Sequence, residues 1–266
     1  MFKLYYGLAS DIFSVKGKKA LITGGSTGLG REMALCLLEN GCEIYLASLI
    51  VDTCPEIASY AESIGGKCHY SYCDVSQTET VVEMINDALS MMGRIDILVN
   101  SAGGSIVKFI ADMDDESWDK VMNVNLRTTF IVSREVIVRA MRPQKYGRII
   151  NISSMKSVFG TALTGHSAYC ASKGAVNALT RQLACETARD NITINAIAPT
   201  FIKTAINESQ LEDETFFNSL VSRIPKGRVG EFRDLMGLLL LLASDASEFI
   251  TGQTILLDGG IAARQE

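Results

Sequence analysis

The sequence predicts an α/β fold in which a doubly wound parallel sheet of about seven strands carries helices on both faces. Strand-like and helix-like segments alternate along the whole chain of 266 residues. No linker or shift in composition divides the chain, and a glycine-rich turn joins the first strand to the first helix. Alternation of this kind is typical of a single parallel sheet, so we expect one domain.

Short apolar segments are predicted to form the strands, and they span residues 19–23, 43–48, 67–73, 95–100, 147–153, 192–198 and 253–258. Amphipathic segments between them predict helices, including those over residues 28–40, 77–92, 114–141 and 168–188. We expect residues 1–14 to form an N-terminal extension and residues 15–266 to form the domain. The least periodic part, about 200–230, is a candidate lid, since parallel sheets bind ligands beyond the carboxyl ends of their strands.

The composition is that of an ordinary globular protein, with 47% hydrophobic and 21% charged residues. A formal net charge of −5 gives no electrostatic reason to expect a nucleic acid or an anionic membrane as partner. The longest apolar run, "LMGLLLLLAS" from Leu235, is about half the ~20 residues that span a bilayer, so it predicts a buried helix.

The cysteines favour a reducing, cytoplasmic setting. There are seven, an odd number, and no Cys-x-x-Cys pair occurs among them. Cys68, His69 and Cys73 lie close together, but nothing elsewhere offers the spacing of a zinc site. We interpret these three as strand residues and expect no metal.

The stretch "ALITGGSTGLGREM" combines a buried strand, a glycine turn and the start of a helix. Gly24, Gly28 and Gly30 follow the pattern G-x-x-x-G-x-G, which allows a tight turn and close approach of a pyrophosphate to the backbone. The helix N-terminus offers unpaired N–H groups and a positive dipole end to the phosphates. Between the first strand and the first helix of an alternating chain, this pattern predicts a dinucleotide-binding Rossmann fold.

The choice between NAD and NADP is open, with NAD slightly favoured. The end of the second strand usually carries the acid that binds the ribose 2′-hydroxyl, and here that position is Ser48. No Lys or Arg that could hold a 2′-phosphate stands at Ser26, Thr27, Ser48, Leu49 or Ile50.

Tyr169 and Lys173 lie four residues apart in a predicted helix otherwise lined with small side chains, so they share one face. A neighbouring cation stabilises a phenolate and lowers its pKa from about 10 towards neutrality, which would let the phenol exchange a proton at pH 7. The alternative is a chance pair, with a solvated lysine and a half-buried tyrosine.

Motifs in a fixed order resemble those of the short-chain dehydrogenase/reductase family, from about Phe13 to the C-terminus. They are "TGGSTGLG", "CDV" at 73–75, "NSAG" at 100–103, "MNVNL", "NISS", "YCASK", "APTFIKT" at 198–204 and "ITGQTILLDGG". The resemblance implies an NAD(P)-dependent oxidoreductase that interconverts a secondary alcohol and a ketone. It also implies a homotetramer.

The resemblance implies four catalytic residues, Asn125, Ser154, Tyr169 and Lys173. Tyr169 would donate the proton in reduction and accept it in oxidation, while Lys173 would lower the phenol's pKa and bind the nicotinamide ribose. Ser154 would bind the substrate oxygen, and Asn125 would hold a water that continues the proton path. The stretch from Ser154 to Tyr169 is about two residues longer than usual, which leaves Ser153 as the alternative serine, although alignment through "IINIS" favours Ser154.

The residues implied at the cofactor are Gly24, Ser26, Thr27, Gly28, Leu29, Gly30, Ser48, Asp74, Val75, Asn100, Ala102, Gly103, Tyr169, Lys173, Pro199, Thr200, Ile202 and Thr204. Asp74 would reach the adenine, and the Ile202 backbone and the Thr204 hydroxyl would bind the carboxamide. Asn100 and Asp96 could instead tie turns beside the cofactor. Thr200 stands where the family usually has glycine, which would alter the backbone beside the nicotinamide.

The substrate is predicted from basic residues in the two segments that should frame the pocket, namely Lys156, His166, Lys203, Arg223, Lys226 and Arg228. Lys156 and His166 are the candidate substrate contacts. Basic lining suits a hydroxylated or carboxylated molecule, although such residues can equally form a solvated face.

The stretches "SRIPKGRVG", "NISSMKS" and "MNVNL" resemble the gluconate 5-dehydrogenase and 2-dehydro-3-deoxygluconate 5-dehydrogenase branch. This resemblance implies a sugar acid or polyol as substrate. The alternatives are a reductase for an apolar ketone, of steroid or 3-oxoacyl type, and a catalytically silent nucleotide-binding regulator.

Overall fold

A seven-stranded parallel sheet forms the centre of the protein, in a computed structural model that describes residues 9–162 and 164–263. The strands are β1 (Lys19–Thr23), β2 (Glu43–Ser48), β3 (Cys68–Tyr72), β4 (Ile97–Asn100), β5 (Gly147–Ile152), β6 (Ile192–Pro199) and β7 (Thr254–Leu257). Every predicted strand is present, and the bounds differ by one or two residues at most. The predicted fold class is confirmed.

The spatial order of the strands is β3-β2-β1-β4-β5-β6-β7. The chain therefore runs outwards from β1 to one edge, returns to the other side of β1, and continues to the opposite edge. β1 pairs with both β2 and β4, and Thr23 lies opposite Asn100 at the carboxyl ends. The direction of the strand order reverses between β1 and β4, and sheets of this kind bind ligands at such a point, beyond the carboxyl ends of the strands.

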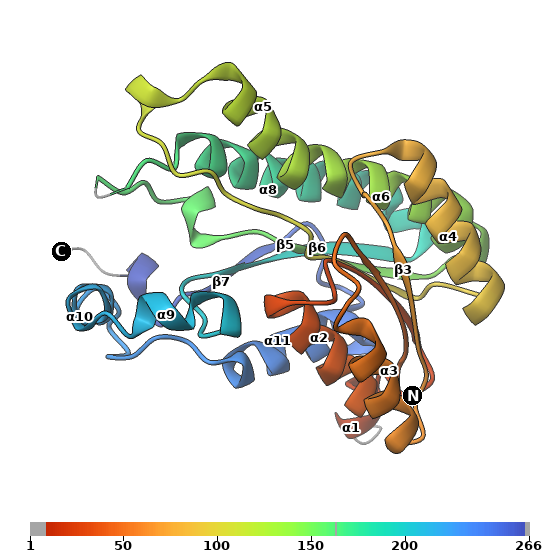
Figure 1. Cartoon of the computed structure of the whole chain (residues 1–266). Helices are drawn as coiled ribbons and strands as arrows, with labels where there is room; N and C mark the ends of the chain where they lie inside the picture. The colour runs from red at the N-terminus through yellow and green to blue at the C-terminus, as the bar shows by residue number, and fades with distance from the viewer. Residues whose placement is uncertain (1–8, 163, 264–266) are drawn as a thin grey trace, which may run out of the picture.

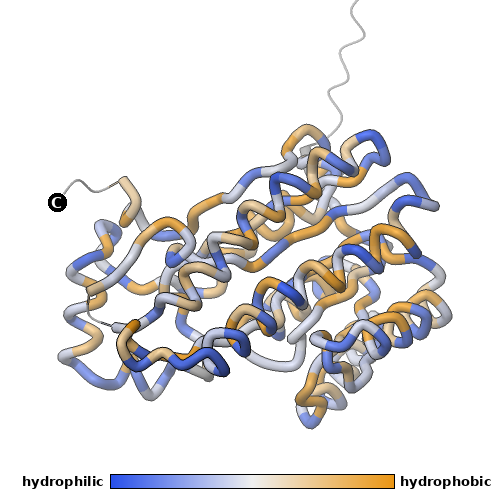
Figure 2. The backbone as a smooth tube through the Cα atoms, turned by 90° about the horizontal axis from the view of Figure 1, so that it is seen from above, coloured by the Kyte–Doolittle hydropathy of each residue, from blue (hydrophilic) through white to orange (hydrophobic). Residues whose placement is uncertain are grey.

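Helices cover both faces of the sheet (Figure 1). On one face lie α4 (Thr78–Met92), α5 (Asp115–Met122), α6 (Thr128–Val136) and α8 (Ser167–Thr187), and on the other lie α2 (Gly28–Glu39), α3 (Cys54–Ser63) and α11 (Phe232–Ala243). The helices alternate between apolar and polar stretches along their length (Figure 2), as expected when each packs one face on the sheet.

The core consists of two apolar clusters, one on each side of the sheet. Successive residues of a strand point to opposite faces, so Leu21 and Ile22 of β1 enter different clusters, as do Leu98 and Val99 of β4. All four side chains are fully buried. Burial on both faces explains why these strands are almost continuously apolar in sequence.

The helix predicted over residues 114–141 is not a regular α-helix. Between α5 and α6 the chain forms a π-helical segment at Asn123–Arg127, and a second one, Ile137–Met141, leads into α7 (Arg142–Gln144). A π-helical turn carries an extra residue and is frequent at functional sites. Asn125 lies in the middle of the first one.

The predicted lid over about 200–230 is more ordered than its sequence suggested. It contains α9 (Glu208–Leu211) and α10 (Glu214–Val221). Its two ends are joined, because Lys203 N–H donates to Gly230 O at 2.8 Å and Gly230 N–H donates to Phe201 O at 2.9 Å. The segment is therefore a loop whose two ends are hydrogen-bonded to each other.

Residues 1–8 of the predicted N-terminal extension lie outside the described residues, and α1 (Ala9–Ile12) precedes β1. Short 3₁₀ turns complete the description, at Ile110–Asp112, Met155–Ser157, Ala188–Asp190, Ala205–Asn207, Asp245–Ser247 and Ile261–Ala263. Within residues 9–162 and 164–263, no helix is both long enough and apolar enough to cross a membrane.

Candidate active site

The glycine turn after β1 leaves its backbone bare. Gly24 has φ +63°, and a Cβ on Gly30 would lie 2.1 Å from the carbonyl oxygen of Gly24. Thr23 Oγ1 accepts N–H groups from Ser101 at 3.2 Å and Ala102 at 3.3 Å, which ties this turn to the loop after β4. Thr23 was not among the residues predicted from sequence, although a threonine at a strand end is a recognisable signal for such a tie.

The N-terminus of α2 opens onto the same turn. Thr27 is extended there, with φ −140° and ψ 166°, and its side chain makes no capping hydrogen bond. The first N–H groups of a helix have no intrahelical partner, so this end can bind an anion. A bare glycine turn beside an uncapped helix start fits the pyrophosphate of a dinucleotide.

The end of β2 is neutral. The hydroxyls of Ser48 and Ser26 are buried and lie 2.7 Å apart, and Thr53 Oγ1 donates to Ser26 O at 2.7 Å. Beyond Ser48 come the exposed side chains of Leu49 and Ile50. Sequence reasoning did not consider Asp52, which is exposed in the same loop.

Asp74 and Val75 hold the start of α4. Asp74 Oδ1 accepts the Ser76 N–H at 3.0 Å, and the Asp74 carbonyl accepts Thr80 Oγ1 at 2.5 Å. Val75 is buried in one of the two core clusters. The predicted contact of Asp74 with an adenine would be made from this fixed turn.

Ser154 lies against Tyr169, and Ser153 does not. Ser154 follows β5 and hydrogen-bonds to the Tyr169 hydroxyl, which projects from α8. The Ser153 hydroxyl instead donates to Asn177 Oδ1 at 2.7 Å and is buried. Side chains alternate along extended backbone, so only one of two successive serines can face the tyrosine.

Lys173 is buried one turn after Tyr169. Its ammonium group donates to the Ile152 carbonyl oxygen at 2.7 Å and lies 5.7 Å from the centre of the Tyr169 ring. Burial lowers the pKa of Lys173 to about 8. The predicted shared face of the two residues is thus present, with the ammonium group held by the sheet.

The sequence predicted that Lys173 lowers the pKa of Tyr169. For the protein without a bound cofactor this direction is wrong. Burial raises the pKa of the phenol, and the hydrogen bond with Ser154 only partly opposes that effect. Desolvation penalises the phenolate more than its surroundings stabilise it. The hydroxyl is therefore protonated at pH 7, the form that donates a proton.

Asn125 supports the turn after β4. Its Nδ2 donates to Gly104 O at 2.7 Å and to Val121 O at 2.9 Å, and its Oδ1 accepts the Gly104 N–H at 3.2 Å. A Cβ on Gly103 would lie 2.7 Å from Asn125 Oδ1 and 3.5 Å from Lys173 Nζ. Gly103 therefore lies between the amide and the ammonium group.

The side chain of Asn100 points into the protein. Its Nδ2 donates to Ser133 Oγ at 2.9 Å and to Asn151 Oδ1 at 2.8 Å, and the residue is buried. Of the two roles considered for Asn100, the structure supports tying adjacent elements. Asp96 has a similar role, because its Oδ2 accepts the Lys19 N–H at 2.8 Å.

The segment after β6 is held by Asn207, which sequence reasoning missed. Asn207 Nδ2 donates to Ile202 O at 2.8 Å, and its Oδ1 accepts the Thr204 N–H at 2.9 Å. Thr200 Oγ1 lies 2.9 Å from Met155 Sδ, which joins the start of the lid to the turn after Ser154. Asparagine three residues after threonine is the capping pattern that could have indicated this role.

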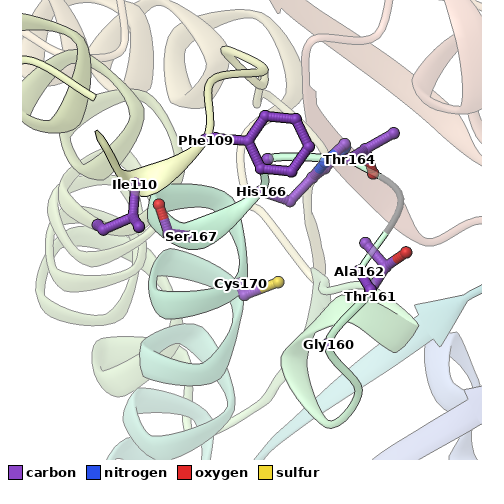
Figure 3. Close-up of a pocket in the computed structure, with 10 residues that line it drawn as sticks. Phe109, Ile110, Gly160, Thr161, Ala162, Thr164, His166, Ser167 and Cys170 are labelled. Atoms are coloured by element: carbon purple, nitrogen blue, oxygen red, sulfur yellow. The ribbon is translucent and has the colours of Figure 1, made fainter. Parts of the chain in front are cut away.

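A pocket of about 510 Å³ opens beside the first turn of α8. Its walls come from residues 160–162 and 164–166, from α8 and from the segment before α5 (Figure 3). Phe109, Ile110, His166 and Cys170 contribute side chains to it. The His166 ring meets the Tyr169 ring edge to face, with centroids 6.1 Å apart, so the pocket adjoins the tyrosine.

The predicted basic residues divide into two groups. Lys203 pairs with Glu208, at 3.3 Å between Nζ and Oε1, and Arg228 pairs with Asp234 on the surface. Lys156 has no carboxylate partner of this kind among the described residues and is half-buried in the turn after Ser154. Burial and the positive charge of Lys156 lower the pKa of His166, so this imidazole is neutral at pH 7. No group of three or more potential metal ligands occurs in the part of the chain that the structure describes.

These features define a dinucleotide-dependent oxidoreductase, with a tyrosine, a serine and a buried lysine at the carboxyl edge of the sheet. The family described as "Enoyl-(Acyl carrier protein) reductase" matches residues 24–262. The chain belongs to the short-chain dehydrogenase/reductase family, and it is an NAD(P)-dependent enzyme of that family.

Similar proteins cover nearly the whole chain. A 2-dehydro-3-deoxy-D-gluconate 5-dehydrogenase of Dickeya dadantii is 37% identical over 96% of this chain and 99% of its own. A 3-oxoacyl-[acyl-carrier-protein] reductase of Thermotoga maritima is 35% identical over 93% of this chain and 98% of its own. The crystal structure of a gluconate 5-dehydrogenase from Burkholderia cenocepacia, in complex with NADP and tartrate, has a TM-score of 0.89 at 33% identity and covers 96% of this chain and 98% of its own.

Proposed function

We propose that this enzyme interconverts a secondary alcohol and a ketone on a sugar acid or related polyol. The observation that carries the proposal is the grouping of Ser154, Tyr169 and Lys173 at one edge of the sheet, next to a pocket. The similarity to 5-dehydrogenases of gluconate and of 2-dehydro-3-deoxygluconate supports the substrate class.

In the proposed mechanism, Tyr169 donates the proton to the carbonyl oxygen during reduction. Its raised pKa keeps the hydroxyl protonated, which suits this direction. Ser154 donates a hydrogen bond to the same oxygen and stabilises the negative charge that develops there. A nicotinamide dinucleotide supplies or accepts the hydride when bound.

Lys173 and Asn125 support the tyrosine. Lys173 is held by the Ile152 carbonyl, from which it can bind the ribose and stabilise the phenolate during oxidation. Asn125 fixes the Gly103–Gly104 turn against the lysine, and the predicted water at Asn125 would continue the proton path.

We propose that the cofactor occupies the crevice after β1 and β4, between the glycine turn and Ala102. Gly28 and Leu29 at the start of α2 would meet the phosphates, and Pro199, Thr200, Ile202 and Thr204 would border the nicotinamide. NAD is the proposed form, because the Ser48 hydroxyl is occupied by Ser26 and the exposed Asp52 would repel a 2′-phosphate. The Burkholderia cenocepacia relative was solved with NADP, so both forms belong in the test.

A second candidate is reduction of an apolar ketone or 3-oxoacyl substrate. Phe109 and Ile110 line the pocket and are 54% and 74% exposed, which gives its mouth an apolar rim. The Thermotoga maritima relative is named as a 3-oxoacyl reductase. This rim is the specific observation that favours the second candidate.

Substrate screening with the purified protein distinguishes the candidates. Sugar acids, neutral polyols, steroid ketones and 3-oxoacyl thioesters would each be tested with NAD(H) and NADP(H), with turnover followed by nicotinamide absorbance. Turnover of sugar acids is expected. Activity confined to steroid or acyl ketones would reject the sugar-acid proposal, and dinucleotide binding without any turnover would favour a silent regulator.

We further propose a homotetramer of a single catalytic domain over residues 15–266, with the lid at about 200–230. A surface hollow of about 540 Å³ is lined by Met122 of α5, Leu126 of the first π-helical segment, Phe130 of α6 and Leu179 of α8, an apolar lining suited to a second subunit. Light scattering would give the assembly mass. A cytoplasmic location is proposed from the seven free thiols.

A further inference from the structure

One face of α8 contacts the end of β5 and the turn that follows it. Tyr169, Lys173 and Asn177 lie four residues apart on this face. Tyr169 hydrogen-bonds to Ser154, and Lys173 donates to the Ile152 carbonyl oxygen. Asn177 is buried, and both ends of its side-chain amide are hydrogen-bonded. The asparagine is therefore fixed against the same segment as the tyrosine and the lysine.

The amide of Asn177 is linked to the backbone of Ser154 through Ser157. Asn177 Nδ2 donates to Ser157 Oγ at 2.7 Å, and Ser157 Oγ donates to the Ser154 carbonyl oxygen at 2.6 Å. The Ser157 N–H donates to the same carbonyl oxygen at 2.9 Å, which closes the 3₁₀ turn Met155–Ser157. A chain of hydrogen bonds thus runs from the helix to the serine assigned to the substrate oxygen.

The direction of each hydrogen bond in this chain is set by its last acceptor. A carbonyl oxygen can only accept, so the Ser157 hydroxyl uses its single hydrogen for Ser154 O. The Ser157 oxygen therefore accepts from Asn177 Nδ2, and Asn177 Oδ1 faces the Ser153 hydroxyl, 2.7 Å away. The opposite orientation of the amide would bring two acceptors together at Ser157.

The position of Ser154 depends on this turn because the residue lies outside β5, two residues after Ile152. Ser154 Oγ accepts the Lys156 N–H at 3.1 Å. This contact occupies one lone pair of the hydroxyl and leaves its hydrogen to be donated to the substrate oxygen. The direction of that hydrogen follows the conformation of the turn, which the link to Asn177 restrains.

We propose that Asn177 is a positioning residue, which acts through Ser157 to hold the Ser154 hydroxyl in place for the reaction. This inference rests on the proposed function, since it takes Ser154 as the residue that binds the substrate oxygen. One face of α8 then supplies the proton donor, the ammonium group and the support of the serine. A displaced donor stabilises the developing charge less well, so the effect should appear in the rate of hydride transfer.

The test is a double-mutant cycle, with D-gluconate and the oxidised dinucleotide in a single turnover followed by nicotinamide absorbance. Asn177→Ala and Ser157→Ala should each slow hydride transfer by about 3- to 10-fold, the effect of one neutral hydrogen bond. Ser157 is only half-buried, so Ser157→Ala keeps the test valid if Asn177→Ala does not fold. The dissociation constant of the dinucleotide, from fluorescence titration, should stay the same in both variants.

The Ser154→Ala background distinguishes positioning from general loosening of the fold. Ser154→Ala should slow hydride transfer by about 100-fold, and it keeps the backbone carbonyl that Ser157 binds. Because the hydroxyl to be positioned is gone, adding Ser157→Ala or Asn177→Ala should cause no further loss. A purely structural role would instead give the same additional loss in both backgrounds.

Thr187→Val is the matched control on the same helix. Thr187 is buried, and its Oγ1 donates to Leu183 O at 2.8 Å. It follows Asn177 by ten residues of α8, about 15 Å along the helix. The variant removes a buried hydrogen bond away from the site, so it should lower the free energy of unfolding and leave hydride transfer unchanged.

Two results would overturn the positioning role while leaving the proposed function intact. One is an unchanged rate in Asn177→Ala or in Ser157→Ala, and the other is a further loss when either is added to Ser154→Ala. A full rate in Ser154→Ala, or a wild-type enzyme that turns over no sugar acid, would reject the proposed function and this inference with it.

Discussion

The ammonium nitrogen of Lys173 lies 2.7 Å from the carbonyl oxygen of Ile152. This hydrogen bond joins the second turn of α8 to the last residue of β5, two residues before Ser154. It fixes the spacing between the helix that carries Tyr169 and the strand end that carries the serine. The hydrogen bond keeps a positive charge buried, and burial of a charge lowers the free energy of unfolding. The effect of this contact can therefore be measured as a change in stability.

Replacement of Lys173 by methionine should stabilise the protein at neutral pH and abolish turnover. The pKa of Lys173 is about 8 in the folded protein and 10.5 in the unfolded chain, so below pH 8 its burial cost is fully present. Lys173→Met should gain roughly 2 kcal/mol at pH 7, allowing about 1 kcal/mol for the lost hydrogen bond. Urea denaturation would measure this gain.

The pH dependence of that gain has a definite sign. Between pH 8 and 10.5 the folded lysine loses its proton while the unfolded one keeps it, so the wild-type protein becomes more stable as pH rises. The advantage of Lys173→Met should therefore shrink across this range. An advantage that is constant with pH, or a variant that is less stable throughout, would contradict the burial cost assigned to Lys173.

The two adjacent serines should differ sharply. Ser154→Ala removes the hydroxyl that contacts Tyr169, and kcat should fall about 100-fold with little change in stability. Ser153→Ala leaves Asn177 Oδ1 without its donor, so it should cost about 1–2 kcal/mol of stability and leave kcat nearly unchanged. Each variant is the control of the other, and a reversed pattern would mean that Ser153 is the catalytic serine.

Tyr169→Phe should remove the proton donor alone. A loss of about 10²–10⁴ in kcat is expected, with the dissociation constant of the dinucleotide nearly unchanged. Steady-state kinetics and fluorescence titration would measure the two quantities. Tyr72→Phe is a suitable control because Tyr72 is 66% exposed on the edge strand β3. Unchanged turnover in Tyr169→Phe would disprove the assigned donor.

Gly30→Ala should weaken dinucleotide binding by at least about tenfold. The added Cβ would lie 2.1 Å from Gly24 O, so the backbone of the glycine turn must shift. Such a shift is destabilising in a closely packed structure and would displace the N–H groups assigned to the phosphates. Gly237→Ala provides the control. Gly237 lies in α11, and a Cβ there would have no neighbouring atom within 4 Å. That variant should keep full affinity and gain about 0.5–1 kcal/mol. Equal affinities in both variants would argue against the assigned phosphate site.

The order of the elements and the glycine turn could be predicted because they depend on local patterns. Alternating apolar segments indicate the strands, and glycine spacing indicates a bare turn wherever it falls between a strand and a helix. The spacing of Tyr169 and Lys173 likewise places both on one face of a helix by geometry alone. The motifs that carry the family resemblance follow from the same local patterns.

The family resemblance favoured Ser154 over Ser153, but the physical reason for the choice is tertiary, because it depends on which of the two side chains faces Tyr169 when α8 packs on β5. The tertiary structure also reversed the expected direction of the pKa of Tyr169, because burial depends on surroundings that no local spacing records. The pairing of Arg228 with Asp234 is a property of the same kind. Desolvation and charge pairing depend on contacts between residues far apart in the chain, so the sequence limits the candidates and packing selects among them.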